Sequence, residues 1–347
     1  MPYGSGLSAQ VMAAQETTWA TPVTVTRAYE FLGETMIFDP TWLASQGLKA
    51  GQAVERASRV TQSRFNVAGD LTMEHTDQGG MGLLWKHALG SAITTPTLVA
   101  TTAYKQIHVP GPRTGFGLTV QIGRPQTDGT VRAHTFNGCK CLGFEFSCSD
   151  NQVAQLKLTL NGQNESTATG LAAATYTAGA GVFSFADAAN FKIGGTATTS
   201  AGETTIASGV AVTTVATGVT ITGTIPAADS RYGLGNAGLK KEQIENGIQT
   251  YTIALAGEYT QRTEFYDLLK SGAATPLQLD FSHGDAGSAN PYLLSFIFPA
   301  VKVKEGGPQV SGADLVDQSI TLQAYDDGTT NPVMQVKLVS KDSVLAP

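Results

Sequence analysis

The sequence predicts a mainly β protein with two tandem antiparallel β domains, each carrying one short α-helix. Two stretches, 65–91 and 247–272, share one order of features: an alternating strand, a polar turn, an amphipathic helix and a closing glycine. Thr, Ala and Gly crowd the other segments, and charged residues make up only 14% of the chain, which suits sheets and tight turns. These observations favour a duplicated β domain over a helical bundle.

In the first stretch, period-two spacing places four residues on one strand face: Val67, Gly69, Leu71 and Met73. A helical stripe follows at spacings of three and four residues, formed by Met81, Leu84, Trp85 and Ala88. Asp77 is the expected N-cap of this helix, and Gly90 is expected to end it.

The second stretch repeats this order with different residues. Alternation places three residues on its strand face: Tyr251, Ile253 and Leu255. The helical stripe consists of Phe265, Leu268 and Leu269. Thr260 is the expected N-cap, and Gly272 is expected to end the helix.

The chain divides into four parts. Residues 1–21 are rich in glycine and alanine and predict an N-terminal arm, loose in the monomer unless a neighbour orders it. Residues 22–163 form the first domain, in which proline and glycine at 39–52 predict a long loop. Residues 164–245 combine a low-complexity segment of short hairpins with a polar connector of the second half. Residues 246–347 form the core of the second domain.

Alternating apolar residues predict the remaining strands. Those of the first domain are expected at 22–32, 53–61, 104–109, 116–122, 130–136, 142–148 and 156–160. Those of the second are expected at 276–281, 292–298, 301–303 and 320–322, and the apolar run 292–298 indicates a strand buried on both faces. The segments 136–141 and 298–303 both begin with Phe and place Lys between two apolar residues, which supports the duplication.

The sequence offers no constellation for catalysis. The five histidines are far apart, and the three cysteines, Cys139, Cys141 and Cys148, fit buried free thiols better than a zinc site. We therefore expect no enzyme activity, no cofactor and no metal. The net charge of −6 argues against a general nucleic-acid binder, and no apolar run approaches the length of a membrane span.

Several segments resemble a known family. The segment 15–23 (QETTWATPV), followed by a strand with Tyr29 and Phe31, resembles the opening of siphophage major tail tube proteins, which build long non-contractile tails. Gly69-Asp70-Leu71 and the segment 83–90 resemble the strand–helix unit of that family. The resemblance implies β-sandwich domains in stacked rings, with inner strands that form a barrel through which phage DNA passes.

The resemblance also implies a structural virion protein, assembled in the host cytoplasm and located in the tail. Its implied partners are further copies of itself, the tape measure, tail terminator and distal tail proteins, and double-stranded DNA in transient passage. One alternative is a β-rich phage surface or receptor-binding module that does not polymerise, and another is an unrecognised hydrolase.

Four residues are candidates for contacts in such a tube. Trp19 and Trp42 lie in segments without an evident core and are candidates for inter-subunit burial, although each could fold back on its own domain. Glu74 and Glu258 are candidate lumen-facing acids, although either could be a solvated outer residue. If each domain supplies about four strands to a barrel of ~24, three copies form a ring with pseudo-sixfold symmetry. The alternative is a true hexamer in which one half lines the bore.

Overall fold

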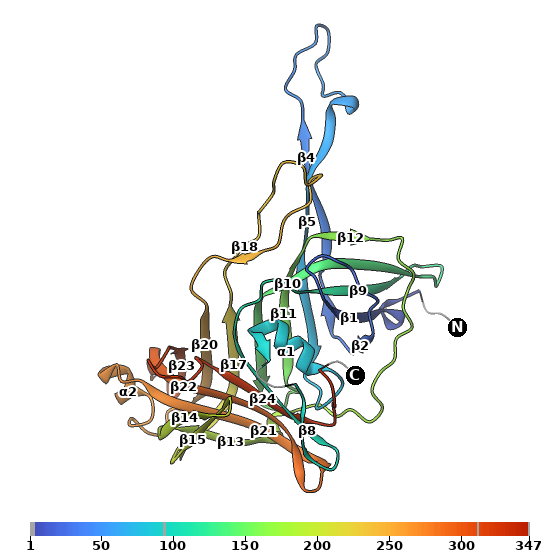
Figure 1. Cartoon of the computed structure of the whole chain (residues 1–347). Helices are drawn as coiled ribbons and strands as arrows, with labels where there is room; N and C mark the ends of the chain where they lie inside the picture. Colours follow the sequence, from blue (N-terminus) through green and yellow to red (C-terminus); the bar gives the residue numbers. More distant parts are fainter. Residues whose placement is uncertain (1–3, 93–94, 311, 346–347) are drawn as a thin grey trace.

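The computed structural model describes residues 4–92, 95–310 and 312–345 and shows a mainly β fold (Figure 1). Its described part contains two α-helices, α1 (Met81–Leu89) and α2 (Tyr266–Ser271). Three single 3₁₀ turns occur at Gly6–Ser8, Ala57–Arg59 and Phe185–Asp187. The prediction of a β protein with two short helices is confirmed.

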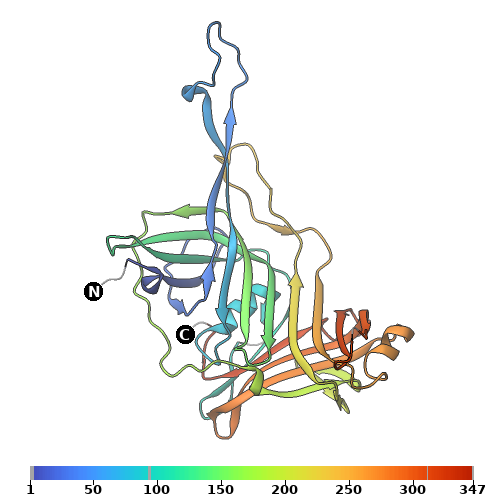
Figure 2. The same cartoon turned by 180° about the vertical axis from the view of Figure 1, so that it is seen from behind.

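Eight strands form a central antiparallel sheet, whose uncovered face is seen in Figure 2. Their order is β4 (Ile37–Ala44), β5 (Val60–Glu74), β11 (Gln155–Gly162), β10 (Val131–Ser149), β17 (Ala216–Thr224), β20 (Thr250–Glu258), β23 (Asp317–Ala324) and β22 (Asn290–Pro308). The sheet is open, because no pairing in the described parts of the chain joins β4 to β22.

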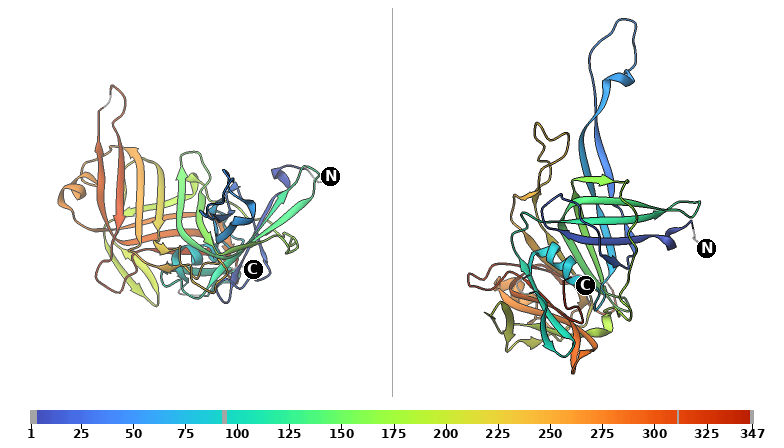
Figure 3. Two further views of the ribbon diagram at one scale, coloured as in Figure 1. Left: turned by 90° about the horizontal axis from the view of Figure 1, so that it is seen from above. Right: turned by 45° about the vertical axis from the view of Figure 1, so that its right-hand side comes forward.

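Two further sheets lie against the other face of the central sheet (Figure 3). The first has the order β2 (Arg27–Tyr29), β1 (Gln10–Glu16), β9 (Gly117–Pro125), the first half of β10, and β12 (Asn164–Ser166). The second has the order β16 (Val210–Ala211), β13 (Ala188–Ile193), β21 (Thr275–Gly287), the first half of β22, β24 (Gln335–Ser340) and β8 (Ala103–Pro110).

The remaining strands are short additions. β6 (Gly90–Ala92) and β7 (Thr97–Ala100) pair with β8, and β3 (Gly33–Glu34) extends β4 along β5. The low-complexity segment forms the hairpin of β14 (Thr196–Ser200) and β15 (Glu203–Ala207), as well as β13, β16 and β17. The connector contains the pair β18 (Ala227–Ala228) and β19 (Ile244–Glu245). The predicted short hairpins therefore exist.

The same pairing order occurs twice along the chain. In both halves a four-stranded part of the central sheet ends in a 19-residue strand, β10 or β22, that continues into an outer sheet. The first half has β4-β5-β11-β10 with β2-β1-β9, and the second has β17-β20-β23-β22 with β16-β13-β21. β12 and β24 take equivalent places beside the two long strands.

One hydrophobic core lies between the layers, and the alternation of the sequence defines its strand faces. Val67, Leu71 and Met73 of β5 are buried in it, as are Tyr251 and its alternate neighbours in β20. The run 292–298 is a central strand between β21 and β24; one of its faces is in the core, and the hairpin of β14 and β15 contacts β22. These expectations are confirmed.

The C-terminal ends of both helices are as predicted, but their N-terminal ends are not. Gly90 and Gly272 end α1 and α2 with positive φ. The N-cap of α1 is Gly80 rather than Asp77, whose carboxylate accepts the Gly181 N–H at 3.0 Å. α2 begins after Phe265, so the predicted cap at Thr260 is also wrong.

Two segments expected to be irregular are strands. Residues 10–16 of the predicted loose arm form β1, which pairs with β2 on one side and β9 on the other. Residues 39–44 of the predicted loop belong to β4, and the rest lies in the tip of a long hairpin that projects beyond the sheet (Figure 1). β1 is ordered by pairing with the distant strand β9, whereas 39–44 pairs with β5, the next strand along the chain.

We predict that Asp342→Ala lowers the free energy of unfolding by about 1–3 kcal/mol, because two buried N–H groups lose their acceptor. The buried Asp342 carboxylate accepts the N–H groups of Gly79 at 2.9 Å and Gly80 at 2.8 Å, just before α1. Urea unfolding followed by tryptophan fluorescence measures this loss. Asp314→Ala, at an exposed position, is the control, and equal stability of the two variants would contradict the prediction.

Three histidines lie in the core around α1. His75 accepts the Trp85 indole N–H at 2.8 Å through Nε2, so its imidazole is neutral. Burial lowers the pKa of His75 to about 4 and the pKa of His87 and His108 to about 3 each. The folded state therefore favours the neutral imidazoles.

We predict that stability is fully present above about pH 6.5, the unfolded pKa of histidine, and falls as the pH approaches 4. The sign follows because the unfolded chain binds these protons first. Each histidine contributes a slope of about 1.4 kcal/mol per pH unit over this range. Urea unfolding at several pH values should give a shallower slope for His108→Gln than for the unchanged chain, and identical slopes would refute this expectation.

Candidate functional site

The uncovered face of the central sheet is a continuous polar surface. Residues that alternate with the core positions lie on it in rows, because the registers of neighbouring strands place them side by side. One row crosses seven strands and consists of Thr72, Lys157, Glu145, Thr222, Thr252, Gln323 and Lys302. The next row consists of Glu74, Gln155, Ser147, Thr220, Ala254, Thr321 and Glu305.

Acidic side chains outnumber basic ones on this face. The two rows carry two lysines and three glutamates, and hydroxyl and amide side chains fill most other positions. Lys157 forms an ion pair with Asp70 at 3.0 Å, and both side chains are partly exposed. Such a face presents hydrogen-bonding groups and more negative than positive charge, without a cluster of cations.

Both acids expected to face a lumen lie on this surface, at half-buried positions. Glu74 is opposite Gln155, and Glu258 is opposite Asp317. The structure does not bring the two acids together, because β11, β10 and β17 separate their strands. The sequence analysis missed further acids on this face, Asp70, Glu145, Glu305 and Asp317, although alternation with core residues would have indicated them.

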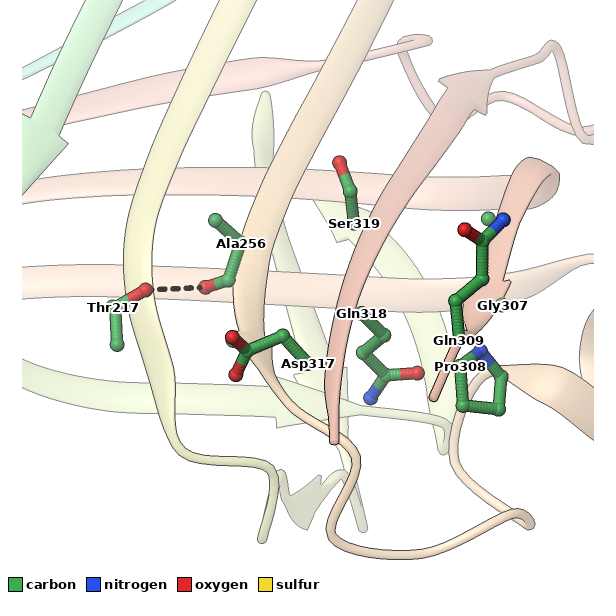
Figure 4. Close-up of a pocket in the computed structure, with 10 residues that line it drawn as sticks. Thr217, Ala256, Gly307, Pro308, Gln309, Asp317, Gln318 and Ser319 are labelled. Carbon is green, nitrogen blue, oxygen red and sulfur yellow. Dashed lines mark hydrogen bonds between the residues drawn. The ribbon is translucent and has the colours of Figure 1, made fainter. Parts of the chain in front are cut away.

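A hollow of about 790 Å³ lies where β17, β20, β23 and β22 end, beside the β22 edge (Figure 4). Its lining includes Gly257, Gly306 and Gly307, and the Thr217 hydroxyl donates to the Ala256 carbonyl at 3.2 Å. Asp317 is the one titratable side chain in this lining. The hollow therefore contains no acid–base pair.

The two candidate tryptophans differ in their surroundings. Trp19 is half-buried, and its indole Nε1 donates to the Gly138 carbonyl at 3.0 Å, so it packs on its own half of the protein. Trp42 is 61% exposed on the projecting hairpin. That hairpin carries four further exposed apolar side chains: Ile37, Leu43, Leu48 and Val54.

Buried charged groups fix the connector 225–249 to the first half. Lys240 is fully buried, and its ammonium donates to the side-chain oxygens of Asn66 and Asn161, the latter at 2.6 Å. Burial lowers the pKa of Lys240 to about 8. Lys140, on β10, forms an ion pair with Glu242 of the connector at 2.6 Å.

Other reactive groups have structural surroundings. The three cysteines are buried free thiols, as expected, and burial raises the pKa of Cys141 and Cys148 to about 11. Across the described ranges, no group of three or more His, Cys, Asp or Glu residues is placed to hold a metal ion. Neither α1 nor α2 is long and apolar enough to cross a bilayer, and the described residues contain no other α-helix.

Comparison with known proteins identifies the family. No curated protein matches the chain. The model of the phage tail tube protein family matches residues 6–324, which cover nearly the whole chain and both halves of the central sheet. The chain therefore belongs to the phage tail tube protein family and is a structural component of the virion tail.

Proposed function

We propose that copies of this chain form stacked rings in which the central sheet lines a continuous bore. The repeated pairing order supports this proposal, because each half contributes four strands to one open sheet. An open sheet leaves unpaired edges, and closure into a barrel with other copies removes them. Membership of the family implies self-assembly and contacts with other tail proteins, for which we propose the tape measure, tail terminator and distal tail proteins.

The strand number favours three copies per ring. Eight strands per chain give ~24 strands in a trimer, and a spacing of about 4.8 Å with a tilt of about 40° gives a backbone diameter near 48 Å. Side chains narrow this bore to roughly 40 Å on the same spacing, which admits duplex DNA. Six copies with all strands lining the bore would double that diameter. We therefore propose a trimer with pseudo-sixfold symmetry.

The chemistry of the uncovered face suits DNA that slides. Each Lys or Arg contact with a phosphate releases counterions and adds affinity for DNA. Many stacked rings would repeat such contacts along the bore and slow the movement of DNA. A face of threonine hydroxyls on which acids outnumber lysines avoids this affinity for phosphates. We propose that Glu74 and Glu258 face the lumen together with the other acids of this surface.

We further propose that the projecting hairpin contacts the neighbouring ring. Large exposed aromatic groups dominate interface energetics when a partner buries them, and Trp42 is such a group. Trp19 is a weaker candidate, because it already packs beside Gly138. Normal tube yield from a Trp42→Ser variant in electron micrographs would contradict this contact.

Electron cryomicroscopy of the purified protein tests the proposed function. We expect hollow tubes of stacked rings with three copies per ring and pseudo-sixfold symmetry. Discrete particles that do not polymerise would contradict the tube. Six identical copies per ring, with only one half of each chain at the bore, would overturn the trimer.

We predict that Thr222→Arg leaves tube assembly intact but slows DNA ejection from virions several-fold, because every copy adds a cation to the bore. Thr222 lies in the middle of the polar face, on β17. Thr198→Arg, on the exposed β14 strand of the outer hairpin, is the matched control and should eject DNA at the normal rate. Time courses of receptor-triggered DNA release measure the effect, and equal rates for the two variants would disprove it.

A further inference from the structure

The central sheet ends in two edges without a backbone partner in the described parts of the chain. β4 pairs along one side only, with β5, and the 302–308 part of β22 pairs along one side only, with β23. The Thr35 N–H donates to the Asp70 carbonyl at 2.9 Å. The backbone groups of Thr35 therefore point toward β5. Because these groups alternate in direction along a strand, those of Ile37 and Asp39 also point toward β5, and those of Phe38 point away from it, toward the free edge.

The chain contains an internal example of the junction between two four-stranded halves. β10 ends the first half and pairs antiparallel with β17, which begins the second. At this junction Phe144 lies opposite Gly223. A Cβ atom on Gly223 would lie 2.1 Å from the Phe144 ring, so the ring on β10 leaves no space for a side chain at this position of β17.

The repeated register identifies the equivalent positions at the free edges. β10 has a bulge between Cys141 and Gly143 where it pairs with β11, and β22 has one between Val303 and Glu305 where it pairs with β23. When the two bulges are superimposed, Gly306 takes the place of Phe144.

The same register extends to the other edge. Gly223 pairs with Tyr251 of β20, and Phe38 pairs with Val67 of β5. Leu160 and Leu322 are equivalent, because they pair with Cys141 and Val303, the residues just before the two bulges. Gly69 pairs with Leu160 and Ile253 pairs with Leu322, so Gly69 and Ile253 are equivalent. Two residues earlier on the same strands, Val67 and Tyr251 are therefore equivalent as well. Phe38 therefore takes the place of Gly223.

We propose that β4 of one copy pairs antiparallel with the 304–308 part of β22 of the next copy, with Phe38 opposite Gly306 and Ile37 opposite Gly307. In the internal junction the aromatic residue is on the long strand β10 and the glycine is on β17. In the proposed junction the aromatic residue is on β4 and the glycine is on the long strand β22, so one aromatic ring is again opposite one glycine. This inference rests on the ring assembly proposed above and names the strands that join its copies. Each such interface is head-to-tail, as ring closure requires.

Both strands lose their free N–H groups at the same point. In this register Met36 lies opposite Pro308, which has no N–H. The Met36 N–H donates to the Glu34 carboxylate at 2.9 Å, and the Met36 carbonyl accepts from Arg124. The junction therefore ends after Ile37 and Gly307, and no N–H group is left without a partner at that point.

The edge also carries charges of both signs. Asp39 lies opposite Glu305 in this register, a like-charge pair that repels, and the nearby Lys302 and Lys304 offset this repulsion. The hollow that includes Gly306, Gly307 and Pro308 borders this edge (Figure 4), and the Tyr266 ring of α2 lies beside Gly307.

Disulfide cross-linking tests the register. Because the backbone groups of Ile37 point toward β5, Ile37 and Gly307 would form a non-hydrogen-bonded pair with Cα atoms about 4.5 Å apart, which suits a disulfide. Mild oxidation of tubes of the Ile37→Cys, Gly307→Cys double variant should give covalent dimers and closed trimers on non-reducing denaturing gels. The native cysteines are buried, and each single variant controls for them.

The matched control is the Thr41→Cys, Gly307→Cys double variant, which displaces one thiol by about 13 Å along the strand, beyond the reach of a disulfide. Tubes without cross-links, or equal cross-linking in the control, would overturn the junction and leave the tube function standing. Absence of tubes from the unchanged chain would overturn the proposed function itself. Cross-linking that closes at six chains would support the junction and overturn the trimer.

If the double variant fails to assemble, hydrogen exchange of the unchanged chain tests the junction between β4 and β22. The Phe38 amide should exchange freely in the monomer and become protected in tubes, while the Ile37 and Asp39 amides, which bond β5, stay protected in both. Free exchange at Phe38 in assembled tubes would refute the junction.

Discussion

Backbone hydrogen bonding along two long strands holds the whole structure together, because β10 and β22 each belong to two sheets at once. The first part of β10 pairs with β9, and its second part pairs with β11 and β17. A shift of register between Phe136 and Cys139, with Gly138 at a φ of 64°, allows this change of partners. Each long strand therefore fixes the position of an outer sheet relative to the central sheet.

The two halves share one core, so they pack as a single unit rather than as two separate domains. Trp85 of α1 makes edge contacts with Phe144 of β10 at 5.3 Å and with Phe296 of β22 at 5.6 Å between ring centroids. β24 also pairs with β8, which joins the end of the chain to the first half. This shared packing fixes the angle between the halves, and that angle sets the curvature of any ring the chain builds.

Threonine explains how one strand pattern produces both a core and a polar outer face. Its branched side chain favours strands, yet it carries neither a charge nor a large apolar surface. In β17, Ile221 points into the core while Thr220 and Thr222 lie on the uncovered face. In the tube proposed above, backbone pairing would supply the strength of the wall, and the outward side chains would need only to avoid binding.

The sequence alone determined which side of the main strands faces the core and the C-terminal ends of both helices, because alternation and glycine are local properties. It predicted a duplication, and the structure shows the same pairing order in both halves. Glu74 and Glu258 lie on the face away from the core. Tertiary structure decided what depends on pairing: β1 is a strand between β2 and β9, and 39–44 forms a projecting hairpin with β5. The turn before α1 is bound by Asp342 rather than capped by Asp77. A carboxylate more than 250 residues away leaves no local pattern, because only the folded chain brings it to that turn.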